Sequence, residues 1–388
     1  MNKIKYKISD FTLIEKGKSP ILKTKEGQYP LVVTAEKRKS SDSFQFNTKA
    51  VCIPLVSSTG HGHASIKRIH YQKGKFALAS IMIALIPDEQ ICHTKYLYYY
   101  IYHIKDKILV PLMKGSANVS LSMSDVKKIE IELPNIEKQK EIVSHLEKID
   151  EMITDHEKMY EDSLSFSHSF CNKLFHNGIT NNVSKESKIG RIPENWDIMK
   201  IDEIADVKGG KRLPSGYQFE NKKTKYPYLR VVDFDNESIN VKNLKYINKE
   251  THEKISKYII SSNDVYISIA GSVGIVGLIP EELNNSNLTE NAARFCNLKN
   301  ISKEYLTNIL NSDMVQIQIQ KSLKITAQPK LALFKIKNLE IPLPSMIEQK
   351  QISDIIKFQK TIFNKLILQK KELQMLKSSI MDKLLQWY

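Results

Sequence analysis

Two long stretches of the chain carry apolar residues at intervals of three and four, the spacing of one face of an α-helix. Each stretch extends over about 40 residues, so each predicts a helix about 60 Å long. The apolar positions are Ile142, Leu146, Ile149, Ile153, Met159 or Tyr160, Phe170 and Leu174 in the first stretch and Ile352, Ile356, Phe363, Leu366, Leu373, Leu376, Ile380 and Leu384 in the second.

A Leu-Pro dipeptide stands before each predicted helix, at Pro134 and Pro344. Proline disfavours helix in the residue before it and suits the first turn of a following helix. Asn135 and Ser345 come next, and both residue types are favoured N-caps. We therefore expect both helices to begin directly after these prolines.

Neither helix can bury its apolar stripe alone. Because two stripes of equal length are present in one chain, we expect the helices to pack on each other as an antiparallel pair. Alternatively, each helix folds back on its own domain or pairs with another chain. His156, Gln359 and Lys370 fall on or near the seam, where a polar residue usually fixes the register.

The rest of the chain shows short apolar runs broken by glycine, a pattern typical of successive strands and turns. Examples are "AVCIPLVSSTG" from Ala50 and "DVYISIAGSVGIVGLIP" from Asp264. Each of these blocks closes in a helix, "HTKYLYYYIYHI" and "SKEYLTNILNSDMVQIQIQ". The tyrosines of the first closing helix lie nearly all round it, so we assign most of them to the core and few to base stacking.

The predicted fold class is α+β, with two pseudo-repeated α/β domains joined by two long antiparallel coiled-coil helices. The expected divisions are a first block at residues 1–115, a first helical repeat at 116–180, a linker and second block at 181–325, and a second helical repeat at 326–388.

The two helical stretches are copies at a constant offset. Pro134 and Pro344 differ by 344 − 134 = 210 positions, and identical residues share this offset: Gln139 with Gln349, Lys140 with Lys350, and Ile142 with Ile352. Upstream the similarity is faint, but "YKISDF" from Tyr6 pairs with "MKIDEI" from Met199, and "QYPLVV" from Gln28 with "KYPYLRVV" from Lys225. The order of blocks and repeats indicates duplication of one large module.

Charge points to an anionic partner. The chain has 58 Lys and Arg against 43 Asp and Glu, a net charge of +15, which favours nucleic acid. Its four cysteines form no C-x-x-C pair, which argues against a zinc ribbon or a disulfide framework. The N-terminus lacks an apolar signal region, and the longest apolar run is too short to span a bilayer. We expect a cytoplasmic protein with no membrane partner.

Catalytic motifs are absent from the sequence, including G-x-S-x-G, H-E-x-x-H and nucleotide-binding loops. Gly271, Gly274 and Gly277 lie between strands, so we expect a hairpin turn there, with a backbone contact to phosphate as the alternative. His61, His63, Lys67, Arg68 and His70 lie beside a glycine turn. The histidines have no third ligand at zinc spacing, so we expect a positive, exposed hairpin that faces phosphates. We expect a binding protein with no catalytic residue, no metal and no cofactor of its own.

The order of these elements resembles the specificity (S) subunit of a type I restriction-modification system, over essentially the whole chain. The matching segments are "GSANVSLS" from Gly115, "IELPNIEKQKEI" from Ile131, "IGRIPENW" from Ile189 and "IPLPSMIEQKQI" from Ile341. The second copy has the family's Glu-Gln pair, whereas the first has Lys138 before Gln139.

The resemblance implies that each block is a target recognition domain for one half of a bipartite DNA target, with the helices setting the spacing. A rod of about 60 Å exceeds the roughly 34 Å of one DNA turn, so half-sites a turn apart are within reach. Two copies of an adenine methyltransferase subunit are the implied partners, with a restriction or translocase subunit outside them. Those partners would bind S-adenosylmethionine and ATP with magnesium.

Candidate contact residues follow from this interpretation. DNA-contact candidates are Ser58, Thr59, His61, His63, Lys67, Arg68, Lys208, Lys211, Arg212, Arg230, Ser272 and Arg294. Helix-frame or partner residues are Pro134, Gln139, Ile142, Leu146, Pro344, Gln349, Ile352 and Ile356. For each basic candidate the alternatives are a phosphate contact or a solvated surface charge. Three other functions stay open: a non-specific coiled-coil scaffold, the specificity subunit of a modification-only system, and a cryptic nuclease or methyltransferase.

Overall fold

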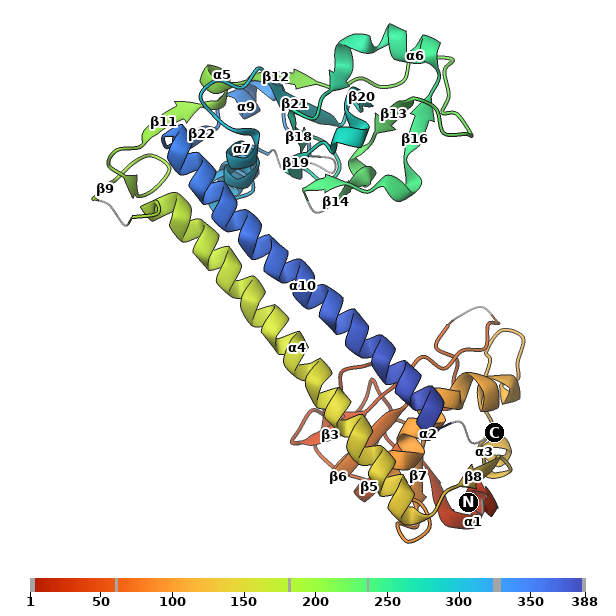
Figure 1. Cartoon of the computed structure of the whole chain (residues 1–388). Helices are drawn as coiled ribbons and strands as arrows, with labels where there is room; N and C mark the ends of the chain where they lie inside the picture. The colour runs from red at the N-terminus through yellow and green to blue at the C-terminus, as the bar shows by residue number, and fades with distance from the viewer. Residues whose placement is uncertain (1–3, 60–61, 181–182, 236, 324–328, 386–388) are drawn as a thin grey trace. The chain divides into compact units, whose positions relative to one another are not determined.

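The computed structural model describes residues 4–59, 62–180, 183–235, 237–323 and 329–385. It forms two compact units: unit 1 runs to Lys158 and resumes at Ile367, and unit 2 is Met159–Leu366. Two long helices, α4 (Ile136–Asn177) and α10 (Met346–Leu384), each contribute one end to each unit (Figure 1). The prediction of two long helices is thus confirmed.

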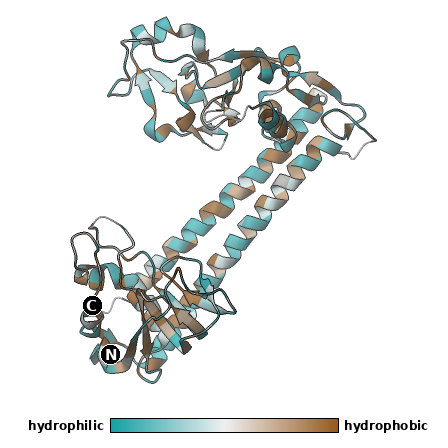
Figure 2. Ribbon diagram, turned by 180° about the vertical axis from the view of Figure 1, so that it is seen from behind, coloured by the Kyte–Doolittle hydropathy of each residue, from teal (hydrophilic) through white to brown (hydrophobic). Residues whose placement is uncertain are grey.

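Both long helices begin with the predicted caps. The Asn135 side chain accepts a hydrogen bond from the amide of Lys138 at 2.9 Å, and Ser345 accepts one from Glu348 at 3.3 Å. These bonds satisfy amides that have no partner within the helix. Hydrophilic and hydrophobic residues alternate along each long helix, as they do in an amphipathic helix (Figure 2).

A two-stranded ladder leads into each long helix. In unit 1, β1 (Ile4–Lys7) pairs antiparallel with β8 (Glu130–Leu133), and in unit 2, β11 (Asp197–Lys200) pairs in the same way with β22 (Glu340–Leu343). Tyr6 lies opposite Ile131, and Met199 lies opposite Ile341. The faint sequence match between "YKISDF" and "MKIDEI" therefore marks equivalent strands and is confirmed.

A six-stranded sheet forms the centre of unit 1, in the order β2-β7-β5-β6-β3-β4. Neighbouring strands are antiparallel except β3 and β6. The strands are β2 (Thr12–Lys16), β3 (Tyr29–Val32), β4 (Lys39–Ser41), β5 (Phe46–Pro54), β6 (His70–Leu78) and β7 (Met82–Pro87).

The continuous apolar sequence of β7 follows from burial on both sides. Ile83 and Leu85 pack into one core cluster with the closing helix α2 (Thr94–Ile108), whereas Met82 and Ala84 pack into a second cluster on the other face. Successive residues of a strand point to opposite faces of the sheet. When both faces are covered, apolar residues are favoured at every position, and polar and apolar residues do not alternate.

Two four-stranded sheets form the centre of unit 2, in the orders β12-β21-β18-β19 and β16-β13-β20-β17. The first contains β12 (Asp206–Gly209), β18 (Val265–Ser268), β19 (Val276–Leu278) and β21 (Ala292–Cys296). The second contains β13 (Tyr226–Leu229), β16 (Lys245–Ile247), β17 (Ile259–Ile260) and β20 (Ser286–Leu288). Two short ladders complete the unit: β9 (Ser184–Lys185) with β10 (Ile192–Pro193), and β14 (Phe234–Asp235) with β15 (Ser238–Ile239).

The Tyr-Pro strands are equivalent in the two units. β3 pairs antiparallel with β4 and parallel with β6, and β13 pairs antiparallel with β16 and parallel with β20. The predicted match of "QYPLVV" with "KYPYLRVV" is confirmed by this shared and uncommon pairing pattern.

Shorter helices cover the sheets. Unit 1 has α1 (Ile8–Phe11), α2 (Thr94–Ile108), η1 (Val110–Leu112) and α3 (Met123–Lys127). Unit 2 has α5 (Ile201–Ile204), α6 (Lys249–Lys254), α7 (Lys303–Leu310), α8 (Asp313–Ser322), α9 (Leu333–Lys337) and the 3-10 turns η2 (Val231–Asp233), η3 (Val241–Asn243), η4 (Ser256–Tyr258) and η5 (Glu281–Leu283). Among the described residues, none of the helices has both the length and the hydropathy needed to cross a bilayer.

The closing helix of unit 2 differs from its prediction. The segment expected to form one helix is divided into α7 and α8, with Asn311 and Ser312 between them. Ser312 adopts an extended conformation, and its hydroxyl donates to the carbonyl of Ile309 at 2.6 Å. Serine competes in this way with helical hydrogen bonds, which explains the break.

Candidate nucleic-acid interface and its supporting frame

A buried glutamine ties α4 to the closing helix of unit 1. The side-chain nitrogen of Gln139 donates to the carbonyl oxygens of Ile91 and Pro134 at 3.0 and 2.9 Å. Its oxygen accepts from the amide of His93, the residue before α2, at 2.8 Å. Three backbone groups beside a fully buried side chain are thereby paired.

Gln349 makes the same three contacts in unit 2. It donates to the carbonyl oxygens of Asn300 and Pro344 at 2.9 and 3.0 Å and accepts from the amide of Ser302 at 2.9 Å. Ser302 precedes α7 as His93 precedes α2. The glutamine of the repeated motif therefore joins the start of each long helix to the block before it.

Apolar frame residues join the ends of different helices within each unit. In unit 1, Ile142 and Leu146 of α4 share a buried cluster with Met381 of α10. In unit 2, Ile352 and Ile356 of α10 share a cluster with Leu174 and Phe175 of α4. The first turns of one long helix thus meet the last turns of the other in both units.

Polar residues also connect the two helices. In unit 1, the ammonium of Lys370 lies 2.9 Å from the Glu157 carboxylate. In unit 2, the side-chain oxygen of Gln359 accepts from the hydroxyl of Ser167 at 3.3 Å. His156, which was also predicted near the seam, is half-buried, and its Nδ1 has no hydrogen-bond partner among the described residues.

The linker before the second block is anchored on α10. Trp196 of the "IPENW" segment is fully buried, and its indole nitrogen donates to Glu348 at 3.0 Å. Glu348 directly precedes the buried Gln349. The linker is therefore bound to the first turn of α10, next to the residue that ties this helix to the second block.

All six DNA-contact candidates of unit 1 fall in the segment between β5 and β6. The Ser57 hydroxyl donates to the carbonyl of His63 at 2.5 Å and accepts from the amide of Ser65 at 3.2 Å. Thr59 also donates to the His63 carbonyl, and Ser58 accepts from the amide of Lys67 at 2.9 Å. These hydroxyls organise the loop itself, while His61 lies outside the described residues.

Two exposed cations remain on this loop. The Lys67 side chain is exposed, and the exposed Arg68 guanidinium lies 3.0 Å from the Glu36 carboxylate. An exposed ion pair of this kind is weak and leaves the cation available to a phosphate.

His70, which we expected to add positive charge to this hairpin, is buried instead. Its Nδ1 accepts from the Arg38 guanidinium at 2.9 Å, so its proton lies on Nε2. Burial and the nearby Arg38 charge lower the pKa of His70 to about 4. The expectation of a charged, exposed His70 is therefore wrong, because a neutral imidazole is what fits beside a guanidinium in the core.

Unit 2 presents exposed cations at the end of β12. Lys211 is exposed, and Lys208 lies 3.3 Å from the Asp206 carboxylate. The Arg212 side chain is 78% exposed although its Nε lies 2.6 Å from the Glu290 carboxylate. These three residues form the second group of accessible positive charge.

Two other arginine candidates are held by carboxylates within unit 2. Arg230 makes paired hydrogen bonds to Asp233 at 3.0 and 2.8 Å, and Arg294 donates to Asp264 at 2.9 Å. Both carboxylates are buried. If either arginine moved away to contact a DNA base, a buried carboxylate would lose its counter-charge. The geometry therefore favours a structural contact at both positions.

The glycine-rich segment that contains Ser272 connects β18 to β19, which pair antiparallel. Ser272 is exposed, and its carbonyl accepts from the Ser268 hydroxyl at 2.5 Å. The predicted hairpin turn is confirmed, while a phosphate contact there stays a prediction.

Sequence reasoning missed Lys18, the unit 1 counterpart of Lys211. Each lysine follows a glycine packed tightly against backbone: a Cβ on Gly17 would lie 2.1 Å from the Ala79 carbonyl oxygen, and one on Gly210 equally close to that of Thr289. The Gly-Lys dipeptide ahead of each Tyr-Pro strand is the signal that could have identified it.

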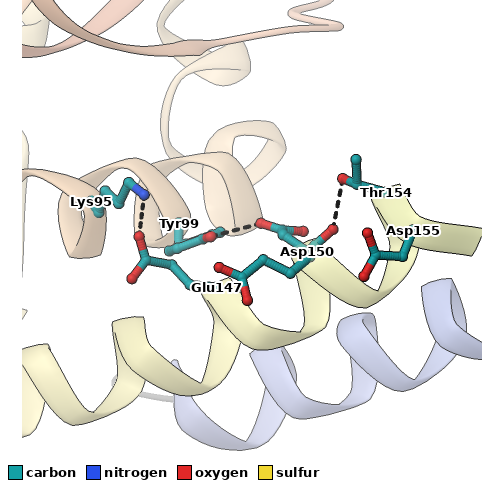
Figure 3. Close-up of a pocket in the computed structure, with 7 residues that line it drawn as sticks. Lys95, Tyr99, Glu147, Asp150, Thr154 and Asp155 are labelled. Atoms are coloured by element: carbon teal, nitrogen blue, oxygen red, sulfur yellow. Dashed lines mark hydrogen bonds and ion pairs between the residues drawn. The ribbon is translucent and has the colours of Figure 1, made fainter. Parts of the chain in front are cut away.

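A groove between α2 and α4 in unit 1 was also not predicted (Figure 3). It encloses about 470 Å³ and is lined by the ion pair of Lys95 with Glu147 and by Asp150, which accepts from the Tyr99 hydroxyl at 2.6 Å. Burial and this hydrogen bond raise the pKa of Tyr99.

The equivalent groove of unit 2, of about 700 Å³, reverses these charges. At offsets of 209 or 210 positions, Glu304 replaces Lys95, Lys357 replaces Glu147 and Lys360 replaces Asp150. The two grooves are related by the duplication but differ in the sign of their charge.

Among the described residues there is no cluster of three or more His, Cys, Asp or Glu side chains that could hold a metal ion. The described residues thus offer exposed cations on two blocks that differ in their sheets. An equivalent glutamine fixes each block to the start of a long helix.

Comparison with known proteins agrees with this architecture. The chain is 25% identical over 394 residues to the MjaVIII type I restriction enzyme specificity subunit of Methanocaldococcus jannaschii, which covers 98% of this chain and 91% of the relative. It is 27% identical to the EcoBI specificity subunit of Escherichia coli over 45% of this chain and 37% of the relative.

Two solved structures share the fold. The S subunit of a type I restriction-modification system from M. genitalium superposes with a TM-score of 0.57 at 17% identity, covering 99% of this chain and 96% of the other. A chain from a study of complex assembly in the type I R-M system gives a TM-score of 0.64 at 14% identity, covering 99% and 97%.

The family model for the type I restriction modification DNA specificity domain matches residues 2–163 and 193–378. These two matches account for most of the chain and follow the duplication seen in both sequence and structure. The chain therefore belongs to the family of type I restriction-modification specificity subunits and carries two copies of the DNA specificity domain.

Proposed function

We propose that this chain reads a bipartite DNA target, with the first block recognising one half and the second block the other. The paired helices α4 and α10 act as an antiparallel coiled coil that sets the distance between the two blocks. The chain catalyses no reaction itself; it recognises the DNA sequence on which its partner subunits act.

One observation carries this proposal: an equivalent frame supports two blocks with different surfaces. Gln139 and Gln349 tie equivalent backbone positions in the two units. By contrast, unit 1 has one six-stranded sheet where unit 2 has two four-stranded sheets. A common scaffold with differing readers fits a target whose two halves differ in sequence.

The exposed cations are the proposed DNA contacts. Lys67 and Arg68 in unit 1 and Lys208, Lys211 and Arg212 in unit 2 are accessible to phosphates or base edges. Ser58, Thr59 and His63 lie on the same loop as Lys67 and Arg68, and Ser272 lies on the turn between β18 and β19. Arg230 and Arg294 are proposed to shape the surface through their bonds to buried carboxylates.

The proposed partners follow from the family. Two copies of an adenine methyltransferase subunit bind the duplicated frame, and a restriction or translocase subunit completes the assembly. S-adenosylmethionine and ATP with magnesium belong to those partners, and a flipped target adenine enters the partner's pocket. A modification-only system would lack the restriction subunit and leave the role of this chain unchanged.

Exchange of the first block tests the proposal. Residues 1–115 are replaced by those of a relative with another target, keeping the contacts of Ile91 and His93 with Gln139. Methylation-sensitive sequencing of DNA modified by the assembled complex should show a change in one half of the target. A change in both halves, or in neither, would refute the modular assignment.

Salt dependence separates recognition from a scaffold role. Specific binding through phosphates should weaken steeply as salt rises, by a slope of about 0.9 per phosphate contact in a double-logarithmic plot. A non-specific scaffold would bind the sequence that the complex methylates no more tightly than a scrambled duplex of equal length.

A further inference from the structure

Leu22 is the most exposed large apolar side chain among the described residues, at 94% exposure. It lies on the segment between β2 and β3, in the block that is proposed to read the first half-site. A single exposed leucine is ordinary on a protein surface. Its surroundings distinguish this one.

Three hydrogen bonds to one carbonyl close the turn that carries Leu22. The carbonyl of Pro20 accepts hydrogen bonds from the amides of Lys23 and Thr24, at 3.2 and 3.0 Å, and from the Thr24 hydroxyl at 2.7 Å. Leu22 is therefore presented on a closed turn.

The base of the segment is fixed to the sheet. The Gln45 side chain accepts from the amide of Lys18 and donates to the carbonyl of Lys16, both at 2.9 Å. Ser19 forms a β-bridge with Ala79. The base of the apolar tip is thus hydrogen-bonded to the sheet, and a group that deforms a ligand needs such a support.

Three lysines lie around the turn, and the exposed Glu26 beside Lys25 carries the opposite charge. Lys18, Lys23 and Lys25 are exposed and line a hollow of about 560 Å³ whose only acidic lining residue is Asp42. None of the three lysines lies within ion-pair distance of a carboxylate among the described residues. Lysines so placed attract a phosphate backbone and would hold it beside the leucine.

We propose that Leu22 inserts between two base pairs of the first half-site and kinks the DNA there, while Lys18, Lys23 and Lys25 hold the flanking phosphates. This inference rests on the proposed DNA-reading function. Apolar wedges of this kind partly unstack a base step, and flexible pyrimidine–purine steps deform most readily. Leu22 thereby contributes specificity through the shape of the DNA.

The wedge belongs to one half-site only. In unit 2 the segment after Gly210 and Lys211 carries no exposed large apolar side chain as far as Tyr226, and its Leu213 packs against the cluster that contains Tyr228. The kink should therefore be confined to the half-site that exchange of residues 1–115 assigns to unit 1.

The test uses the complex of the full chain with its methyltransferase partner and a 40-base-pair duplex carrying the site found by methylation-sensitive sequencing. 2-Aminopurine is placed at successive positions of both half-sites, because its fluorescence rises when a base unstacks. Dyes at the two ends report bending by energy transfer. Leu22→Ala, Leu22→Met and the control Leu13→Ala, at a residue 59% exposed on β2 of the same unit, are compared with the parent chain.

We expect the parent to raise fluorescence at one step of the first half-site. Leu22→Ala should abolish that signal and the bend and weaken specific binding about tenfold, the loss of one buried leucine contact. Leu22→Met should retain both signals, and Leu13→Ala should change neither. Replacing a flanking lysine by alanine should instead lower the salt slope by about 0.9.

Two results would overturn the proposal. One is a parent complex that binds its target specifically without unstacking any base of the first half-site. The other is a Leu22→Ala complex that keeps the unstacking, the bend and the affinity. A complex with no sequence preference at all would instead contradict the proposed function, so the two failures are distinguishable.

Discussion

Replacing Gln139 by leucine should loosen the closing helix of unit 1 while leaving unit 2 intact. Leucine fills a similar volume but offers neither donor nor acceptor. The amide of His93 and the carbonyls of Ile91 and Pro134 would each lose a partner at 2.8 to 3.0 Å. An unpaired buried backbone group costs about 1 to 3 kcal/mol, and the added apolar burial offsets part of that loss.

We expect a net cost of about 3 kcal/mol for the opening of this segment, which corresponds to a change of about a hundredfold in its opening equilibrium. Hydrogen exchange followed by mass spectrometry measures that equilibrium peptide by peptide. Peptides that cover residues 91–100 should exchange about a hundredfold faster in Gln139→Leu. Peptides that cover residues 300–309 should keep the exchange rate of the parent chain.

The duplication supplies its own control. Gln349→Leu removes the equivalent contacts in unit 2 and should accelerate exchange at residues 300–309 only. Lys140→Leu, at the exposed position after Gln139, should change neither region. Unchanged exchange at residues 91–100 in Gln139→Leu, or an equal increase in both units, would refute the reasoning that each glutamine is a local tie.

Three further predictions concern packing and charge. Arg294→Ala should lower the free energy of unfolding by about 3 kcal/mol in denaturant titrations, because the buried Asp264 carboxylate keeps the hydrogen bond from the Ser261 amide but loses its counter-charge; an effect below 0.5 kcal/mol would contradict this. Gly17→Ala should reduce the melting temperature strongly, because its Cβ would overlap a carbonyl oxygen. The control Gly209→Ala, at the glycine before Gly210 in unit 2, should leave the melting temperature unchanged, because a Cβ there has room. Unfolding experiments from pH 7 to pH 4 should show a loss of stability that His70→Gln reduces. The pKa of His70 is lowered to about 4 in the folded chain, so its contribution is present above pH 6.5 and is lost as the pH falls toward 4.

The frame was predictable from sequence because its determinants are local. Helical spacing, the Leu-Pro dipeptide and the cap residues Asn135 and Ser345 all lie within a few positions of the structure they specify. A repeat at constant offset added a second, independent reading of the same element. The division between α7 and α8 was missed because the apolar spacing continues across Ser312 and hides its capping preference.

The candidate interface was less predictable because a charged residue's availability depends on distant partners. Arg294 is held by Asp264, thirty positions earlier, and only the pairing of β18 with β21 brings the two together. Lys18 was missed although it is exposed, since the sequences of the two blocks diverge around it. Charge composition indicates an anionic partner but cannot tell an accessible cation from one already paired.

The two units are alike in their backbone ties and unlike in their grooves. The glutamine contacts are identical, yet Lys95 and Glu147 in one groove correspond to Glu304 and Lys357 in the other. One partner surface cannot be electrostatically complementary to both grooves. If the two identical partner subunits proposed above docked at these grooves, they would have to rely on features that the units share, or bind with unequal strength. Salt should then weaken one binding step and favour the other, because screening removes an attraction at one groove and a repulsion at the other.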